Sequence, residues 1–454
     1  MIALRIAALA LVVATIYALP FALARGRVDI CYPDETYYAA RVMDAWHGGD
    51  LRNPYLAGHE RSPKYLPELV ERTYALTARS LHVPPLTVLA ASRVVLAVAL
   101  TIALTYFGIA LGLSPGMATL AGACPALFPP ILTLLQTPGT GEHGFLRLFR
   151  IVSPAAHMLL LVVALWCVYV VWKGGRWWQW IAAGIALGVL AYVPIYYWAF
   201  AMLGTLLLAI RRRALFWSLL VAAVVSLPHF IHAAQVMRSP EVIETLARLR
   251  LMIPGRLPEP DVPRRLIENL IVIAALLLIR NRFLLAFLIA GEVLLVQNAI
   301  TNRQMQAFHF MHCLFVVWPL AAALVWQHFG GERRRFLDGA FAALLVASAV
   351  LVQWIAFATW EERMWERPQL YALNRVMPET LAWLNAKTPP GSVVLAAPDV
   401  MASLPLYTHN KVYWAQYAGQ YVVSDRDVEL RADDVAHPNR PFHFRVDYVL
   451  SNRR

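Results

Sequence analysis

Two adjacent carboxylates, Asp34 and Glu35, follow the first apolar segment of the chain in the sequence PDETYY. At the boundary between water and lipid, such a pair could accept a proton from a hydroxyl group or hold a cation. The pair also suits a helix start, where Asp34 would be the N-cap residue and Glu35 would favour the helix dipole. The sequence leaves both interpretations open, and they are compatible with one another.

Basic and amide side chains suited to phosphate binding occur at three further places. Arg150 stands just before Ser153 and Pro154, which mark a firm helix start, and a helix N-terminus attracts anions. A short polar turn at 298–309 separates two apolar segments, as the lining of a cavity would. Snorkelling of Arg150 toward lipid headgroups and simple solvation of the turn are the alternatives. The candidate phosphate-binding residues are Arg150, Arg303, Lys64 and Gln304.

Four aromatic or histidine side chains are candidates for lining a substrate cavity. His157 follows Arg150 on a similar helix face, and His309 ends the polar turn. The alternative for His157 is an ordinary helix-contact role, and the alternative for His59, as for Lys64, is that of a surface residue. The four cysteines form no CxxC pair and predict neither a disulfide framework nor a zinc site, so metal dependence stays open. The candidate cavity residues are His59, Tyr38, His157 and His309.

The composition is that of a membrane protein. Hydrophobic residues make up 59% of the 454 residues and charged residues only 15%, which is more apolar surface than a soluble fold can bury. Hydropathy predicts about eleven membrane-spanning helices. Their expected ranges are 3–24, 86–111, 115–135, 153–172, 177–193, 195–210, 214–235, 265–280, 283–300, 310–328 and 336–357.

The net charge of +12 does not indicate a nucleic-acid partner, because much of it lies in short turns between apolar segments. Basic clusters occur on alternate turns, at 173–176, 211–213, 280–282 and 333–335. All of them fall on one side of the membrane if Met1 is cytoplasmic, which agrees with the enrichment of Lys and Arg in cytoplasmic loops. The larger loops and the tail then face the periplasm or the cell exterior.

The first exported loop, 25–85, is predicted to be structured. Apolar residues from Tyr38 to Trp46 recur at helical spacing, which is typical of an amphipathic helix, and Gly48-Gly49 ends it. We expect this helix to lie in the membrane interface. A second helical stretch follows Pro67.

The tail after the last span alternates helix and strand patterns. A helix is expected at 378–387, and strands at 392–397, 411–414 and 445–451. This alternation predicts a small exported α/β domain at 358–454, beside a membrane domain at 1–357. The tail contains no Gly-rich phosphate fingerprint, so the sequence assigns it no cofactor.

This layout resembles the GT-C glycosyltransferases, which are polytopic membrane enzymes that use lipid-phosphate sugars. Three stretches carry the resemblance. The segment 33–38 is similar to the acidic motif of the family's first loop, and 150–154 is similar to an Arg-x-x-Ser-Pro helix start of bacterial members. The tail segment 381–395 is similar to the exported domain of bacterial relatives of the protein mannosyltransferase and aminoarabinose-transferase group. No signature like the WWDYG motif of oligosaccharyltransferases occurs.

The resemblance implies a sugar donor on a polyprenyl phosphate, an acceptor that is a lipid, a glycan or a protein, and a bacterial inner-membrane location. Asp34 would be the general base of an inverting transfer at the outer face, with Glu35 as a supporting acid or a ligand of a divalent cation. Arg150, Arg303 or Lys64 would hold the donor phosphate. The alternatives are an exported-face glycan ligase or polymerase that relies on Arg and His, and a transporter, which Glu292 inside a predicted span would favour.

Overall fold

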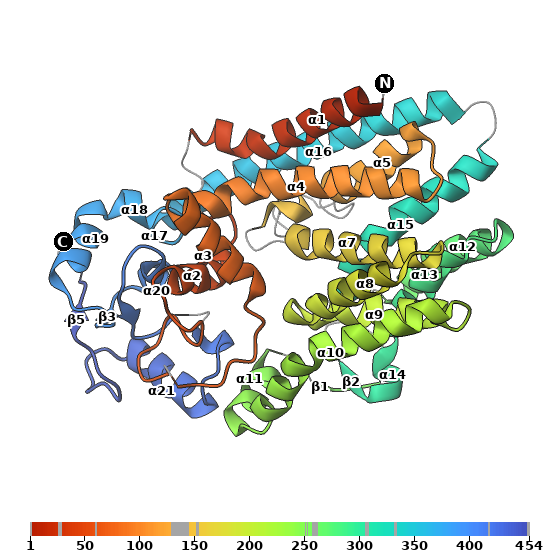
Figure 1. The fold of residues 1–454 in the computed structure, drawn as a ribbon. Coiled ribbons are helices and arrows are strands. Elements are labelled where there is room, and N and C mark those ends of the chain that lie inside the picture. Colours follow the sequence, from red (N-terminus) through yellow and green to blue (C-terminus); the bar gives the residue numbers. More distant parts are fainter. Residues whose placement is uncertain are drawn as a thin grey trace.

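The computed structural model describes residues 2–25, 30–59, 61–128, 145–150, 154–249, 251, 253–256, 262–304, 308–330, 334–415 and 418–451. These residues form a bundle of apolar helices, with a mixed assembly of helices, loops and short strands at one end (Figure 1).

Six helices of the described residues are long and apolar enough to cross a membrane, and three shorter apolar helices accompany them. Each of the segments predicted to span the membrane contains a helix, but the expected count of about eleven crossings is not confirmed. The bundle helices are α1 (Ile2–Leu23), α4 (Pro85–Ala110), α5 (Pro115–Leu127), α7 (Pro154–Trp172), α8 (Trp177–Val189), α9 (Ile195–Ala209), α10 (Arg213–Val236), α12 (Val262–Leu278), α13 (Arg282–Leu295), α15 (Phe308–Phe329) and α16 (Arg334–Glu366).

Small residues let several of these helices approach closely. Gly184 and Gly188 of α8 face the backbone and valine side chains of α10, and a Cβ atom at Gly184 would lie 2.6 Å from the Ser218 carbonyl oxygen. Gly204 of α9 lies against the ring of Phe287 in α13. Because lipid tails are as apolar as the helices themselves, such close packing is a main source of attraction between helices in a membrane.

The turns that carry basic clusters gather at one end of the bundle. Figure 1 shows the turns after α7, α9 and α12 at the same end as the N-terminus, away from the labels α2, α19 and α21. The backbone at Gly174 lies against the Arg212 guanidinium, so two of the basic turns are in direct contact. These basic turns therefore lie at one end of the bundle, as the alternation of charge predicts. The fold alone does not say which side of the membrane that end faces.

The first loop folds into α2 (Glu35–Trp46) and α3 (Leu69–Leu81). Gly48, with a φ of +84°, ends α2, as predicted. The expected interfacial position needs correction, because α2 is not exposed along one face to lipid. Tyr37, Ala39, Arg41 and Val42 are all buried, since the helix lies between the bundle, α3 and the tail.

The tail forms the predicted α/β arrangement. The strands β3 (Val393–Leu395), β4 (Lys411–Val412) and β5 (Tyr448–Val449) make a parallel sheet in the order β4-β3-β5. The last bundle helix, α16, continues to Glu366, past the expected boundary at 357. The helices of the tail are α17 (Pro368–Tyr371), α18 (Leu373–Val376), α19 (Pro378–Lys387), α20 (Pro398–Ser403) and α21 (Asp425–Ala436), with 3-10 turns η3 (Leu404–Leu406) and η4 (Ala418–Gln420).

The tail is bonded to both neighbouring loops. The Val412 amide donates to the Tyr55 carbonyl at 2.7 Å, so loop 1 continues the edge of the sheet. In α11 (Pro240–Arg248), Arg248 forms an ion pair with Asp425 and donates to the Gly419 carbonyl at 2.9 Å. Loop 1, α11 and the tail thus make one assembly over the end of the bundle.

Candidate active site

Asp34 and Arg150 form an ion pair at the end of the bundle covered by loop 1. Asp34 stands at the N-cap position of α2, but its side chain makes no capping hydrogen bond. The carboxylate instead meets the guanidinium of Arg150, which lies 5.4 Å from the ring centre of Tyr32. The two side chains are 35% and 40% exposed, so a ligand can reach both of them.

Glu35 is placed quite differently from its neighbour. Its side chain is 1% exposed and pairs at 2.8 Å with Arg93 of α4, which is fully buried. The same carboxylate oxygen accepts hydrogen bonds from the amides of Cys31, at 2.7 Å, and Tyr32, at 3.3 Å. Such a group cannot easily touch a substrate, and its contacts instead fix the turn from which Asp34 projects. Arg93 thus occupies the carboxylate that was expected to act as a supporting acid or a cation ligand.

Arg93 was missed by the sequence reasoning. It falls within the predicted span 86–111, and a charged residue inside an apolar run is itself a signal, because it must be paired or used. Its guanidinium carbon lies 5.0 Å from the ring centre of Phe149 and 5.7 Å from that of Phe21. Arg93 therefore joins the turn of loop 1 to the segment that carries Arg150.

The position of Arg150 is set by the buried residues that precede it. Phe145 and Phe149 stack with ring centres 4.7 Å apart on either end of η1 (Arg147–Phe149), and both are buried. The amide of Leu146 donates to Gln353 of α16 at 3.3 Å. The predicted helix cap Ser153 lies outside the described residues, but the helix does start at Pro154.

Two histidines of the predicted cavity lie within electrostatic reach of one another, and one of them lies within reach of this ion pair. The charge of Arg150 acts on His309, and His309 in turn acts on His157. Two tyrosines at the start of α9 hold the rings: Tyr196 stacks on His309 with centres 4.6 Å apart, and Tyr197 lies 5.4 Å from His157.

Tyr38, predicted as a cavity residue, is half-buried and lies close enough to Tyr196 for the two to interact. Burial raises the pKa of Tyr38, so its phenol stays protonated and can donate a hydrogen bond. The structure therefore brings together five of the predicted site residues from four separate parts of the chain. They are Asp34, Tyr38, Arg150, His157 and His309.

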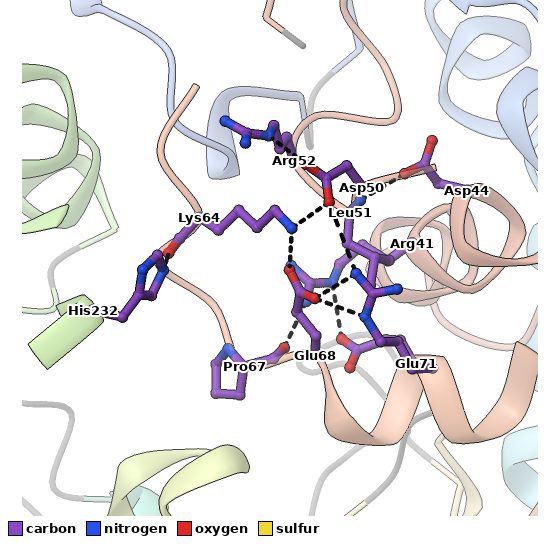
Figure 2. Close-up of polar contacts among 11 residues, drawn as sticks. Arg41, Asp44, Asp50, Leu51, Arg52, Lys64, Pro67, Glu68, Glu71 and His232 are labelled. Atoms are coloured by element: carbon purple, nitrogen blue, oxygen red, sulfur yellow. Dashed lines mark hydrogen bonds and ion pairs between the residues drawn. The ribbon is translucent and has the colours of Figure 1, made fainter. Parts of the chain in front are cut away.

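Lys64 and His59 belong to other contacts. The Lys64 ammonium forms ion pairs with Asp50 and with Glu68, the latter at 3.3 Å, as Figure 2 shows. The ring of His59 lies 3.6 Å from Asp427 of the tail. Both residues tie loop 1 together or to the tail in these contacts. Phosphate binding by Lys64 and a place for His59 in the cavity stay predictions.

Arg303 and Gln304 form the short strand β2, which pairs with β1 (Ile253–Pro254). The Arg303 side chain is exposed, and its carbonyl accepts a hydrogen bond from Gln297 of α14 (Gln297–Thr301) at 3.0 Å. The Gln304 side chain lies outside the described part of the structure. Phosphate binding by these two residues stays a prediction.

A buried ion pair in loop 1 holds α2 in place from its other side. Arg41 contacts Glu71 of α3 at 2.9 Å and donates to the Pro67 carbonyl at 2.6 Å (Figure 2). Burial acts to lower the pKa of Arg41, but the combined effect of Glu71, Tyr37, Tyr421 and Glu68 is larger, so the pKa is raised. With Arg93 at one end and Arg41 in the middle, α2 is anchored to two neighbouring helices.

The described residues contain no group of three or more His, Cys, Asp or Glu side chains that could hold a metal ion. A divalent cation at the acidic pair would have to compete with Arg93 for Glu35 and with Arg150 for Asp34. Each of the two carboxylates is thus paired with an arginine in this structure, and the requirement for a metal stays open.

No protein-family model and no curated protein sequence matches the chain. Solved structures do match in fold. The oligosaccharyltransferase of Archaeoglobus fulgidus, in its apo form, has a TM-score of 0.56 and 13% identity over 92% of this chain. ArnT from Cupriavidus metallidurans has a TM-score of 0.53 and 14% identity over 94% of this chain in the apo state. ArnT bound to undecaprenyl phosphate has a TM-score of 0.52 and 13% identity over 90% of this chain.

The chain spans 65% of the archaeal oligosaccharyltransferase but 90% of apo ArnT and 85% of the lipid-bound form. At these identities the similarity establishes the fold alone, and this fold is shared with the archaeal oligosaccharyltransferase and with ArnT. The fold class expected from the resemblance is confirmed.

Proposed function

We propose that the protein is a membrane glycosyltransferase that takes a sugar from a polyprenyl-phosphate donor. The observation that carries the proposal is the accessible Asp34–Arg150 pair, which places a carboxylate beside a guanidinium on a fold shared with such enzymes. The presence of undecaprenyl phosphate in one ArnT structure supports a donor of this class. The acceptor is a hydroxyl group of a lipid, a glycan or a protein.

The ion pair suggests how donor binding prepares the site. A carboxylate held by a guanidinium is a weaker proton acceptor than a free one. A donor phosphate is a competing partner for Arg150, because guanidinium binds phosphate with two parallel hydrogen bonds. When phosphate takes Arg150, Asp34 is released and becomes the stronger base at the moment when the substrate is in place.

The chemistry is then a direct displacement. The acceptor oxygen attacks the anomeric carbon, its proton passes to Asp34, and the bond from the anomeric carbon to the phosphate oxygen breaks. Arg150 stabilises the negative charge on the departing phosphate, and the neighbouring His309 and Tyr38 offer further hydrogen-bond donors. A single displacement inverts the anomeric centre. Glu35 and Arg93 hold the turn and do not take part.

We further propose that the end of the bundle with α2 and the tail faces the periplasm or the cell exterior of a bacterial inner membrane. The basic turns at the opposite end support this orientation. Cysteines introduced at Asn439 and Glu241, both exposed, should react with an impermeant maleimide added outside cells, and a cysteine at Arg212 should not. Labelling only at Arg212 would reverse the orientation.

A ligase or polymerase that relies on arginine and histidine is the second candidate, because Arg150, His309 and His157 lie together. In that mechanism Asp34 would be dispensable. The residue that favours a transporter, Glu292, is hydrogen-bonded through one carboxylate oxygen to Asn269 of the adjacent helix.

The experiment is transfer of a radiolabelled sugar by purified protein in lipid nanodiscs, with a panel of polyprenyl-phosphate sugars and the extracted membrane lipids and glycans as acceptors. The proposal expects turnover that Asp34→Asn abolishes and that Arg440→Ala, a change at an exposed arginine of the tail, leaves intact. Transfer that survives Asp34→Asn but is lost in His309→Ala would favour the ligase.

A further inference from the structure

A partly open cavity lies at the far end of α2, away from Asp34. It has a volume of about 460 Å³ and is lined by the end of α2, the start of α4 and the tail. This is within the range of about 300–1,000 Å³ that is usual for small-molecule sites. The cavity touches the first residues of α4, which is one of the candidate membrane-spanning helices.

The cavity is separate from the Asp34–Arg150 pair. The helix α2 has 12 residues, and a rise of about 1.5 Å per residue makes it about 18 Å long. Asp34 precedes its first turn, whereas Met43 and His47, which line the cavity, belong to its last turn and the residue after it. A ligand in this cavity therefore does not contact the candidate active site, although both sites share one rigid helix.

The walls combine an apolar side with a hydrogen-bonding side. Pro84, Pro85 and Leu86 supply flat or branched apolar surfaces from the start of α4. The tail supplies Asn385, whose amide nitrogen donates to the Tyr407 carbonyl at 2.9 Å. That single bond leaves the second amide hydrogen and the amide oxygen of Asn385 for a ligand.

Two histidines supply ring nitrogens to the cavity. The Nε2 atom of His409 lies 2.9 Å from the Thr388 carbonyl, and because a carbonyl only accepts, that nitrogen carries the hydrogen of the bond. Burial lowers the pKa of His47, and the nearby His409 adds to this effect against Asp44. No Lys, Arg, Asp or Glu lines the cavity in the described residues.

We propose that this cavity binds a neutral, hydroxyl-rich ligand, namely one or more uncharged sugar units. Sugar rings have C–H faces that pack on proline and tyrosine rings, and hydroxyl groups that pair with amides and imidazole nitrogens. Uncharged walls give no favourable partner to a phosphate or a carboxylate, whose desolvation would be costly. The proposal rests on the proposed function only in taking the sugar as part of an acceptor glycan that reaches from this cavity toward Asp34.

The test is saturation-transfer NMR on the full-length protein in lipid nanodiscs, prepared without maltoside detergents, whose headgroups are themselves neutral sugars. The probes are methyl glycosides of neutral hexoses and pentoses, with glucuronic acid and zinc chloride as contrasting ligands. The variants are Asn385→Leu and His47→Phe, both at accessible positions. The matched control is Asn439→Leu, which makes the same change at an exposed asparagine of the tail outside the cavity.

We expect at least one neutral glycoside to bind and each cavity variant to weaken it about fivefold to tenfold, the effect of one lost hydrogen bond, with the control unchanged. Equal binding in all variants, absence of binding across the panel, or preference for glucuronic acid would overturn the proposal. Tight zinc binding that depends on His47, without glycoside binding, would make the cavity a metal site instead. Because the experiment measures binding and not transfer, it can contradict the cavity proposal without contradicting the proposed transferase function. Loss of the transferase function would likewise leave a positive binding result valid.

Discussion

Asp34 and Glu35 are adjacent in the chain and each pairs with an arginine, but the two ion pairs lie in different surroundings. The Glu35–Arg93 pair is 1% and 0% exposed and has amide hydrogen bonds around it. The Asp34–Arg150 pair is 35% and 40% exposed. The same chemistry in two environments therefore serves two purposes, since a buried pair is costly to break and an accessible one can exchange partners with a ligand.

The comparison separates the pair that stabilises the turn from the pair that we propose to react. Glu35 and Arg93 join loop 1 to the bundle, and the turn they fix carries Asp34 at its end. Arg150 approaches from another segment, on the buried rings of Phe145 and Phe149. The two pairs can be tested independently, because one should govern stability and the other substrate binding and turnover.

The largest expected effect on stability comes from the buried pair. Arg93→Met leaves the Glu35 carboxylate buried without its cation, and the free energy of unfolding should fall by about 3–5 kcal/mol. Denaturant unfolding in a defined lipid mixture measures this. Arg211→Met, at an exposed arginine of a basic turn, is the control, and a loss no greater than that of the control would contradict the structural role.

A double variant sharpens the same point. In Arg93→Met with Glu35→Gln no unpaired charge stays buried, so part of the lost stability should return, with a coupling energy of up to about 3 kcal/mol between the two positions. The double-mutant cycle is measured in the same unfolding assay. Additive losses would mean that the two side chains do not act as a pair.

The accessible pair should govern donor binding. Arg150→Ala removes a charged hydrogen-bond donor, worth about 1.5–3 kcal/mol, so polyprenyl-phosphate affinity should fall about tenfold to a hundredfold. Arg303→Ala is measured in parallel, and Arg440→Ala serves as the control. Unchanged affinity in Arg150→Ala, Arg303→Ala and their combination would remove arginine from the account of donor binding.

The smallest effect on the free energy of unfolding is expected when the accessible pair is removed. Asp34→Asn removes an ion pair that is more than one-third exposed, and such pairs contribute less than about 1 kcal/mol. Asn can also occupy an N-cap position. A thermal melt followed by circular dichroism checks this. A loss as large as that of Arg93→Met would mean that Asp34 is structural, like its neighbour.

Much of the fold follows from local patterns in the sequence. Helices occupy all the apolar segments, α2 ends at Gly48, and strands occur within 392–397, 411–414 and 445–451. These features depend on hydropathy, spacing and turn residues, which are local. The expected number of membrane crossings is not confirmed, because several helices are shorter than the length needed to span a bilayer at right angles.

The roles of individual site residues depended on partners far away in the chain. Nothing near Glu35 indicates that Arg93 will meet it, and nothing near His59 indicates Asp427. Burial of one acid and exposure of the other follow from how α2 packs, which a local pattern does not determine. Lys64 meets Glu68 only four residues later, but both precede the helix α3, so this ion pair does not follow from helical spacing either.

The central claim is that Asp34 reacts with the substrate while Glu35 stabilises the turn that carries Asp34. The most direct test is single-turnover transfer at saturating donor for Asp34→Asn and Glu35→Gln, each in lipid nanodiscs. Asp34→Asn should bind the polyprenyl-phosphate donor and remain folded, yet transfer the sugar about two orders of magnitude more slowly or worse. Glu35→Gln should lose stability, and the molecules that remain folded should transfer at close to the parental rate. Parental transfer by Asp34→Asn with the donor bound would contradict the account.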